Sequence, residues 1–268
     1  MAIITLTTDL GTKDFYVSAI KGTIISELSN KVTIVDITNE IPIFDISTAA
    51  YTLKNSFNYF PKGSIHIVSV DSEINANTAA ILMEYKGHYF IGADNGLFSL
   101  IFDYPPDKFY ELKINQDTDI MTFPTKNIFV KAACHIARGG TPEIIGTRIK
   151  SIKASHKPRP ITNNDFIRGS IIHRDSYGNA ISNISKRLFE EIGRGRKFVI
   201  QFKSYEIKEI YHLYSQANHG GETAAIFNTS GDLEIALYRG VEGSGGGASQ
   251  LLGLSINETI TVEFFNKH

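Results

Sequence analysis

Asp9 is the first residue whose type and position could serve chemistry, because it follows an apolar, β-branched run at 3–8 and is followed two positions later by Gly11. Residues 15–28 then carry apolar side chains at helical spacing, so the pattern predicts a strand that leads into a helix. Open α/β folds bind ligands at the carboxyl ends of their strands. A carboxylate there can accept two hydroxyl hydrogen bonds, which suits the diol of a ribose. The alternative is that Asp9 caps the following helix.

A second carboxylate, Asp71, occupies a comparable position. It follows the apolar residues 64–70, which predict another buried strand, and precedes the polar loop 72–77. Helical patterns separate the predicted strands, and right-handed crossovers through such helices make strands parallel. Parallel strands end at the same edge of a sheet, so Asp9 and Asp71 are predicted to lie on one edge.

The densest polar cluster in the second half of the chain spans residues 171–179, where a predicted strand leads into a turn. Asp175 could bind an ammonium group, Tyr177 could stack on a base, and Asn179 could read an adenine edge. The alternative is an Asx-type turn with a packed tyrosine, which the local sequence favours when taken alone. The turn at 228–231 is equally ambiguous.

In the first half, strand and helix patterns alternate, which indicates an α/β domain with a mainly parallel sheet. Besides the elements around Asp9 and Asp71, the patterns predict a strand at 31–36, helices at 46–57 and 121–138, and a hairpin of strands at 79–84 and 88–92. The Asn-Gly pair at 95–96 indicates a turn that requires positive φ.

A basic, proline-containing stretch without periodicity at 152–164 has the composition of a domain boundary. We therefore expect domains at 1–155 and 165–268. The second domain carries one strong helical pattern at 185–192 and short strand patterns at 166–174, 197–202, 223–227, 233–237 and 259–264. It is predicted to be a smaller β-barrel-like or sandwich domain. Its glycine run at 243–247 lacks the Gly-Lys-Ser/Thr of a phosphate-binding loop and is interpreted as a flexible loop.

Composition limits the classes of partner. The 268 residues carry 27 basic and 28 acidic side chains, so a net charge of -1 gives no electrostatic case for nucleic acid or an anionic membrane. Cys134 is the single cysteine, which excludes an intrachain disulfide and a thiolate metal cage and indicates a packed core thiol. The sequence shows neither a leader pattern nor an apolar run of about 18 residues, so we expect a cytoplasmic protein without membrane spans.

Six segments in the same order along nearly the whole chain resemble one family: residues 7–11 (TTDLG), 36–42 (DITNEIP), 60–66 (FPKGSIH), 93–97 (ADNGL), 175–179 (DSYGN) and 233–236 (LEIA). They are similar to the S-adenosyl-L-methionine (SAM) hydroxide adenosyltransferases, or SAM hydrolases, which are related to the fluorinases and chlorinases. The resemblance implies an α/β domain joined to a β-barrel-like domain in a homotrimer, with nucleoside sites between neighbouring subunits.

The resemblance also implies roles for residues at the nucleoside. Asp9 would hold the ribose diol, Asn179 would read adenine, and Tyr177 would stack or pack beside the base. Asn95, in the matched ADNGL segment, is expected among the substrate-binding residues.

At the methionine end, the resemblance implies that Asp175, Thr229 and Ser230 would bind the ammonium and carboxylate. Asp71 would belong to the catalytic loop and orient or activate water for attack on the ribose C5′, which releases L-methionine and adenosine. The sulfonium is a good leaving group, so the displacement mainly requires an aligned and desolvated oxygen nucleophile. No metal and no cofactor are expected, since SAM itself is the ligand.

The chain departs from the family at the reaction centre. An Arg after the catalytic Asp and a His in the segment matching 122–127 are missing, with Thr78 and Pro124 at or near their positions. Glu73 and Lys126 could substitute, although both are also typical of a solvated surface. Asn39 stands where the family commonly has a His.

Three functions remain. The leading prediction is a SAM hydrolase, and the alternative is a catalytically degraded protein that binds SAM or adenosine. A halogenase-like transferase is the weakest, because Asp71 stands where the resemblance places a tyrosine in halogenases.

Overall fold

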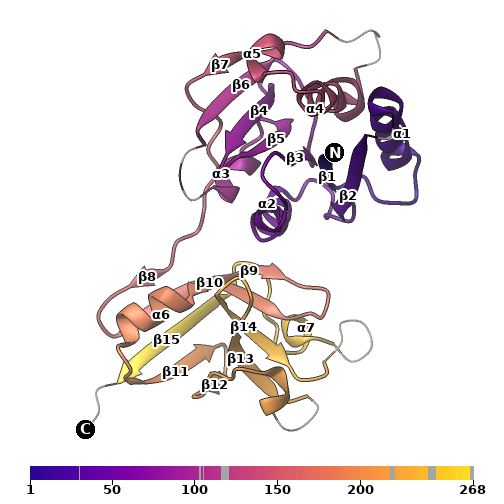
Figure 1. The fold of residues 1–268 in the computed structure, drawn as a ribbon. Coiled ribbons are helices and arrows are strands. Elements are labelled where there is room, and N and C mark those ends of the chain that lie inside the picture. The colour runs from indigo at the N-terminus through magenta and orange to yellow at the C-terminus, as the bar shows by residue number, and fades with distance from the viewer. Residues whose placement is uncertain are drawn as a thin grey trace. The chain divides into compact units, whose positions relative to one another are not determined.

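The computed structural model describes residues 1–29, 31–102, 104, 106–115, 121–217, 221–240 and 246–265. The chain divides into two compact units, Met1–His156 and Lys157–His268, each with its own core (Figure 1). No helix among these residues is both long enough and apolar enough to cross a membrane.

The first unit is built on a seven-stranded sheet with the order β2-β1-β3-β5-β4-β6-β7. The strands β2, β1, β3 and β5 are parallel neighbours, and the predicted hairpin joins β5 to β4, from which the sheet continues antiparallel. The carboxyl ends of β1, β3 and β5 therefore share one edge, as predicted. The strand bounds are β1 Ala2–Thr8, β2 Val32–Thr38, β3 Ile65–Ser69, β4 Ala80–Tyr85, β5 His88–Ala93, β6 Lys108–Leu112 and β7 Gly146–Ile149.

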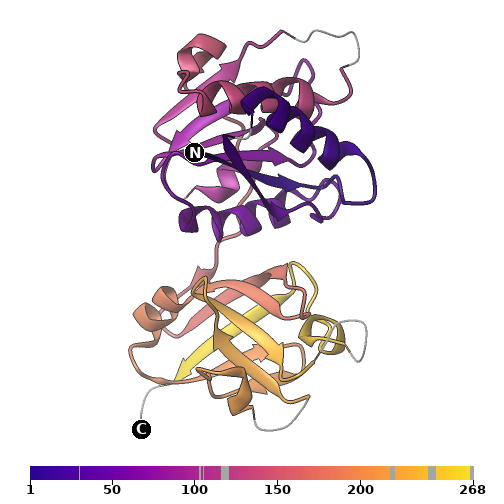
Figure 2. The same ribbon diagram turned by 45° about the vertical axis from the view of Figure 1, so that its right-hand side comes forward.

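Helices cover both faces of this sheet (Figure 2). One face packs against α1 and α4, and the other against α2 and α3. The bounds are α1 Tyr16–Leu28, α2 Ile46–Lys54, η1 Phe57–Tyr59, α3 Leu97–Ile101, η2 Thr125–Phe129, α4 Val130–Ala137 and α5 Pro142–Ile145.

Two helices have bounds in the structure that differ from those predicted from the sequence. The helix predicted at 46–57 ends at Lys54, where the Asn55 and Ser56 side chains donate hydrogen bonds to carbonyls of the preceding turn. The helix predicted at 121–138 starts only after Pro124, with one π-helical turn. Proline fits the start of a helix because its missing N–H would be unpaired there.

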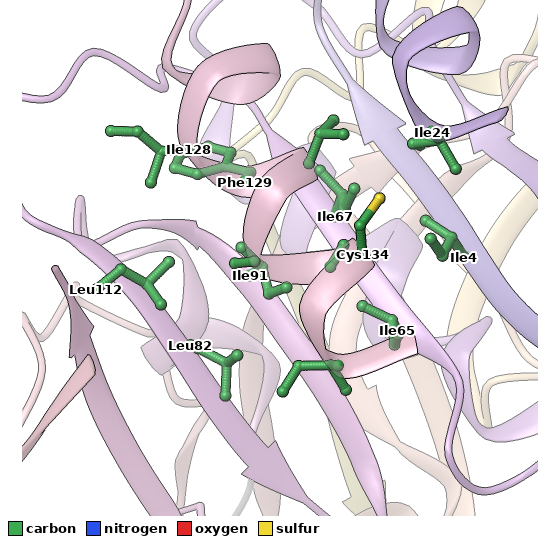
Figure 3. Packing of buried hydrophobic residues seen from close by; sticks show 14 of the residues in the cluster. Ile4, Ile24, Ile65, Ile67, Leu82, Ile91, Leu112, Ile128, Phe129 and Cys134 are labelled. Carbon is green, nitrogen blue, oxygen red and sulfur yellow. The ribbon is translucent and has the colours of Figure 1, made fainter. Parts of the chain in front are cut away.

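Cys134 lies within the core of the first unit, as predicted, among Ile4, Ile65 and Ile67 (Figure 3). The thiol is fully buried, and burial raises its pKa to about 11. A protonated, buried thiol is a packing group rather than a nucleophile.

The second unit is a nearly closed, barrel-shaped antiparallel sheet with the order β12-β11-β15-β9-β10-β14-β13, to which β8 adds at β9 (Figure 1). This confirms the β-barrel-like prediction. The bounds are β8 Ile161–Thr162, β9 Phe166–Arg174, β10 Ala180–Ser185, α6 Lys186–Gly193, β11 Lys197–Phe202, β12 Tyr205–Ile207, η3 Tyr214–Gln216, β13 Thr223–Phe227, β14 Asp232–Leu237, α7 Ala248–Leu251 and β15 Thr259–Phe265.

Candidate functional site

Asp9 joins three segments at the carboxyl edge of the first sheet. Its backbone N–H donates to the Ser69 carbonyl at 3.1 Å, which continues the pairing of β1 with β3 by one residue. Its Oδ2 atom accepts hydrogen bonds from the backbone N–H groups of Phe44, at 3.0 Å, and Asp71, at 3.2 Å. The helix-cap alternative is wrong for Asp9, because Phe15 occupies the N-cap position of α1.

Asp71 is held in a left-handed backbone conformation, with φ of 46°, and its side chain is exposed. The Asn95 Nδ2 group donates to the carbonyls of Val70 and Asp71, both at 2.9 Å, while its Oδ1 accepts from the Leu97 N–H at 3.1 Å. A left-handed non-glycine residue is strained by about 1 kcal/mol or more, so these bonds help to fix it. The structure thus brings Asp9, Asp71 and Asn95 together.

A cluster of three hydroxyl groups lies where β3 meets η2, and the sequence patterns did not indicate it. The Ser69 and Thr125 hydroxyls are 2.6 Å apart and fully buried. Ser72, the residue after Asp71, places its hydroxyl 3.3 Å from Ser69 and 3.5 Å from Thr125. These groups anchor the start of the Asp71 loop to η2, in the segment where the family's His was expected.

Of the other residues considered for the reaction centre, Thr78 and Asn39 have hydrogen-bond partners, Glu73 is exposed and Lys126 is half-buried. Glu73 is exposed, which agrees with its surface interpretation, and Lys126 is half-buried. The Thr78 hydroxyl accepts from Lys153 Nζ at 3.2 Å. Asn39 is buried, and its Oδ1 accepts from the Thr8 hydroxyl at 2.9 Å.

An open depression of about 550 Å³ lies beside the Asp71 loop, in the first unit. Its walls come from residues 74–77, Asp94, the end of β6 and Ile128. None of the predicted site residues lines it, so we do not assign the ligand to it.

In the second unit, Asp175 organises the turn that follows β9. Its Oδ1 accepts from the backbone N–H groups of Tyr177, at 3.0 Å, and Asn179, at 2.8 Å, and its Oδ2 accepts from Asn179 Nδ2 at 2.9 Å. This is the Asx-type turn of the alternative interpretation. The packed tyrosine of that interpretation is wrong, because the Tyr177 side chain is 69% exposed, whereas Asn179 is buried.

The Asn228 amide organises the second predicted turn. Its Oδ1 accepts from the Ser230 N–H at 3.0 Å, the Ser230 hydroxyl at 2.6 Å and the Asp232 N–H at 3.2 Å. Its Nδ2 donates to Glu234 Oε2 at 3.1 Å. Thr229 lies exposed between these residues.

Glu234, in the matched segment 233–236, is a buried carboxyl. Its side chain lies in β14, and its Oε1 accepts from the Tyr214 hydroxyl at 2.7 Å. Burial and, to a lesser extent, the negative charge of Asp175 raise the pKa of Glu234. Burial and the same hydrogen bond raise the pKa of Tyr214, so the phenol stays protonated as the donor.

Gly247 brings the start of α7 against the Asp175 turn. A Cβ atom at this position would lie 2.5 Å from Gly178 Cα and 2.6 Å from the Tyr177 carbonyl oxygen, so only glycine fits. The Ser249 N–H also donates to the Gly178 carbonyl at 2.8 Å. The flexible loop predicted at 243–247 is therefore wrong for Gly247, while residues 243–245 lie outside the described residues.

Among the described residues, no three His, Cys, Asp or Glu side chains are grouped so that they could hold a metal ion.

Comparison with known proteins identifies the family. Residues 4–146 match the SAM hydroxide adenosyltransferase N-terminal domain, and residues 169–261 match the C-terminal domain of the same family. These matches cover most of both units. The chain belongs to the SAM hydroxide adenosyltransferase family.

Relatives with curated names agree with this family. The (R)-S-adenosyl-L-methionine hydrolase of Methanocaldococcus jannaschii is 34% identical over 192 residues, which cover 69% of this chain and 67% of the relative. The enzyme of the same name from Thermus thermophilus is 27% identical over 247 residues, covering 87% and 90%. A fluorinase from an Actinoplanes species is 24% identical over 270 residues, covering 87% and 90%.

Solved structures share the fold. An uncharacterized conserved protein from Thermotoga maritima superposes with a TM-score of 0.86 and 26% identity, covering 97% of this chain and 99% of that one. A conserved hypothetical protein from Thermus thermophilus superposes with a TM-score of 0.75 and 23% identity, covering 99% and 100%.

Proposed function

We propose that this protein hydrolyses SAM to adenosine and L-methionine. The observation that carries the proposal is the hydrogen bond from the Asp71 N–H to the Asp9 carboxylate, with Asn95 bonded to the Asp71 carbonyl, at the carboxyl edge of the parallel strands. In a member of this family, that arrangement joins a ribose-binding group to the loop that carries the catalytic acid.

Asp9 is suited to the ribose because its two oxygens are used differently. Oδ2 is occupied by the Phe44 and Asp71 N–H groups, which orient the carboxylate. Oδ1 accepts no hydrogen bond from the described residues and is available for hydroxyl donors. The neighbouring Ile43 and Phe44 side chains are 72% and 70% exposed, which provides apolar surface next to Asp9 for a ligand or a second subunit.

The second unit supplies groups for the two ends of the ligand. Tyr177 is exposed and can stack on adenine, and Asn179, already ordered by Asp175, would read the base edge. Asp175 carries the negative charge that the methionine ammonium requires. The Thr229 hydroxyl can donate to the methionine carboxylate, and the Ser230 hydroxyl, which donates to Asn228, can accept from the methionine ammonium.

In the reaction, a water oxygen forms a bond to the ribose C5′ while the C5′–S bond breaks, and the sulfur retains the electron pair as the thioether of L-methionine. Asp71 orients the water and accepts its proton. The Ser72 hydroxyl, beside Asp71 and bonded to the Ser69–Thr125 pair, is a second group that can orient the water. Ordinary proton exchange with solvent returns Asp71 to its charged form.

We also propose a cytoplasmic homotrimer with intersubunit sites. The support is the family, together with the exposed Ile43 and Phe44 beside Asp9. Mass photometry of the purified protein should give the trimer mass, and a monomer would contradict an intersubunit site.

The test of the activity is incubation of the purified protein with SAM, with adenosine and methionine followed by chromatography. Asp71→Asn is the control, because it keeps the loop shape while removing the carboxylate. Adenosine formed by the wild type and lost in the variant supports hydrolysis. Halide-dependent formation of a halogenated nucleoside would instead indicate the halogenase-like reaction.

The second candidate function is binding of SAM or adenosine without turnover. The observation that favours it is the absence of the family's Arg and His at the reaction centre, where Thr78 bonds Lys153 and Pro124 begins a helix. Binding of adenosine in calorimetry by a sample that yields no product would establish this function.

A further inference from the structure

Glu234 is the most buried carboxyl side chain among the described residues, at 3% exposure. It lies in β14 between the buried residues Leu233 and Ile235, in a strand with apolar neighbours on both sides. A buried carboxylate is costly unless hydrogen bonds compensate it, and an apolar residue of similar volume often gives equal or greater stability. Packing alone therefore does not account for a glutamate at this position.

One of the two hydrogen bonds of Glu234 leads to the predicted methionine-binding turn, and the other comes from Tyr214 in η3. Oε2 accepts from Asn228 Nδ2 at 3.1 Å and Oε1 accepts from the Tyr214 hydroxyl at 2.7 Å. Because a carboxylate only accepts, it determines which end of the Asn228 amide faces it. The Asn228 oxygen is then turned to the Ser230 N–H and hydroxyl, at 3.0 and 2.6 Å.

Glu234 is also linked to the Asp175 turn. Its neighbour in the β10–β14 pairing is Ile181, and the adjacent pair joins Ile235 to Ala180, the residue directly after Asn179. The negative charge of Asp175 adds to burial in raising the pKa of both Glu234 and Tyr214, so the two carboxyls lie within electrostatic reach. The negative charges of Glu234 and Asp175 together strengthen the negative potential that favours a cationic group.

We propose that Glu234 is a positioning residue for the amino-acid end of the ligand: it fixes the Asn228 amide, and through it the Ser230 hydroxyl, and adds to the negative potential at Asp175. The proposal rests on the proposed function, because it takes the methionine moiety of SAM as the group bound at these turns. Glu234 itself touches no reacting atom.

Glu234→Gln is the decisive variant, because it keeps the shape and removes the charge and one acceptor. Glutamine offers an N–H group to one of the two donors, so either Asn228 turns over or Tyr214 loses its bond. We expect the affinity for L-methionine to fall on the order of tenfold, as for loss of a hydrogen bond to a charged group, while adenosine affinity stays unchanged. With SAM, KM should rise by a similar factor at constant kcat.

Two further variants sharpen the test. Asn228→Ala should reproduce the loss of methionine affinity, and the double variant should be no worse than either single one, because both act through the same turn. Glu206→Gln, at an exposed glutamate of β12, is the charge control and should leave both affinities unchanged.

The outcomes separate this proposal from the proposed function. If the wild type binds adenosine and methionine and Glu234→Gln binds both as well as the wild type does, the positioning role is wrong and the proposed function stands. Equal loss of both affinities would mean that Glu234 only maintains the fold. A wild type that binds neither methionine nor SAM would overturn both.

Discussion

Asparagine in place of Asp9 separates the structural role of this carboxylate from its proposed role in ligand binding. Asp9 Oδ2 accepts two backbone N–H groups, from Phe44 and Asp71, and Oδ1 is the atom proposed to bind the ribose diol. Asparagine can keep its oxygen at the Oδ2 position, so both backbone bonds survive as neutral hydrogen bonds. The atom facing the ribose then becomes an NH₂ group, which cannot accept from hydroxyls.

The expected magnitudes follow from these bonds. A hydrogen bond to a charged group contributes about 1.5–3 kcal/mol, and Asp9 is partly exposed, so the lower end applies. Asp9→Ala, which loses both backbone bonds, should destabilise the protein by about 3 kcal/mol and lower Tm by about 6–12 °C. Asp9→Asn should cost only about 1 kcal/mol. Its adenosine affinity should nevertheless fall at least tenfold, since both ribose hydrogen bonds are lost.

Calorimetry with adenosine and 2′-deoxyadenosine on the wild type and Asp9→Asn completes a double-mutant cycle. The wild type should bind the deoxynucleoside about tenfold or more weakly than adenosine. In Asp9→Asn that difference should shrink, because the partner of the missing hydroxyl is already lost. An undiminished difference would refute the assignment of Asp9 to the ribose, whatever the effect on stability.

Three further predictions concern other parts of the two units. His66 is buried between Thr5 and His88, at 2.7 and 3.2 Å, and burial, then His88, lowers its pKa from 6.5 to about 3. Below about pH 6.5 the unfolded chain therefore takes up a proton at His66 that the folded chain does not. The contribution of His66 to the free energy of unfolding is complete above this pH and is lost as the pH falls toward 3. Urea unfolding should show a loss of about 2 kcal/mol between about pH 7 and about pH 5; an equal loss in His66→Gln would assign it to other groups. Cys134 should stay unreactive toward a thiol reagent until the protein unfolds, because it is buried with its pKa raised to about 11; labelling of the native protein at the rate of a free thiol would contradict this. Gly247→Ala should weaken adenosine and methionine binding by displacing the Tyr177–Gly178 backbone, whereas Gly22→Ala, which meets nothing within 4 Å in α1, should be neutral or slightly stabilising; calorimetry and thermal unfolding measure both, and unchanged binding by Gly247→Ala would show that the turn tolerates the added methyl group.

The edge that joins Asp9 and Asp71 was predictable because local patterns determine it. Apolar runs separated by helical patterns define parallel strands, and a residue that directly follows each strand must lie at the common edge. The barrel-like second unit was predictable for a similar reason, since β9, β11 and β13 have the bounds that their patterns gave.

The network around Glu234 could not be predicted, because Tyr214 lies outside the hairpin that holds the other two residues. Asn228 and Glu234 lie within the β13–β14 hairpin, whereas Tyr214, 20 residues before Glu234, lies in η3 and meets the glutamate only in the folded unit. A glutamate within an apolar strand also fits an exposed alternate position, so its burial is visible only in the fold. The only indication in the sequence that Glu234 is important was its place in the matched segment 233–236.

The strand β10 was not predicted because Ser182 and Asn183 interrupt its apolar pattern. In the structure both side chains have partners: the Ser182 hydroxyl donates to the Leu233 carbonyl, and Asn183 Oδ1 accepts from the Ser170 N–H. Polar residues can occupy a strand where neighbouring backbone groups complete their hydrogen bonds. Gly247 escaped prediction for a related reason, since the backbone that approaches it lies about 70 residues away in sequence.

The central claim is that this protein transfers the adenosyl group of SAM to water. The most direct measurement is mass spectrometry of the nucleoside formed from SAM in water enriched in the heavy oxygen isotope. Attack of water on C5′ predicts adenosine that carries the heavy isotope in its 5′-hydroxyl, with Asp71→Asn giving none. Adenosine without the isotope, or no adenosine from the wild type, would contradict the claim.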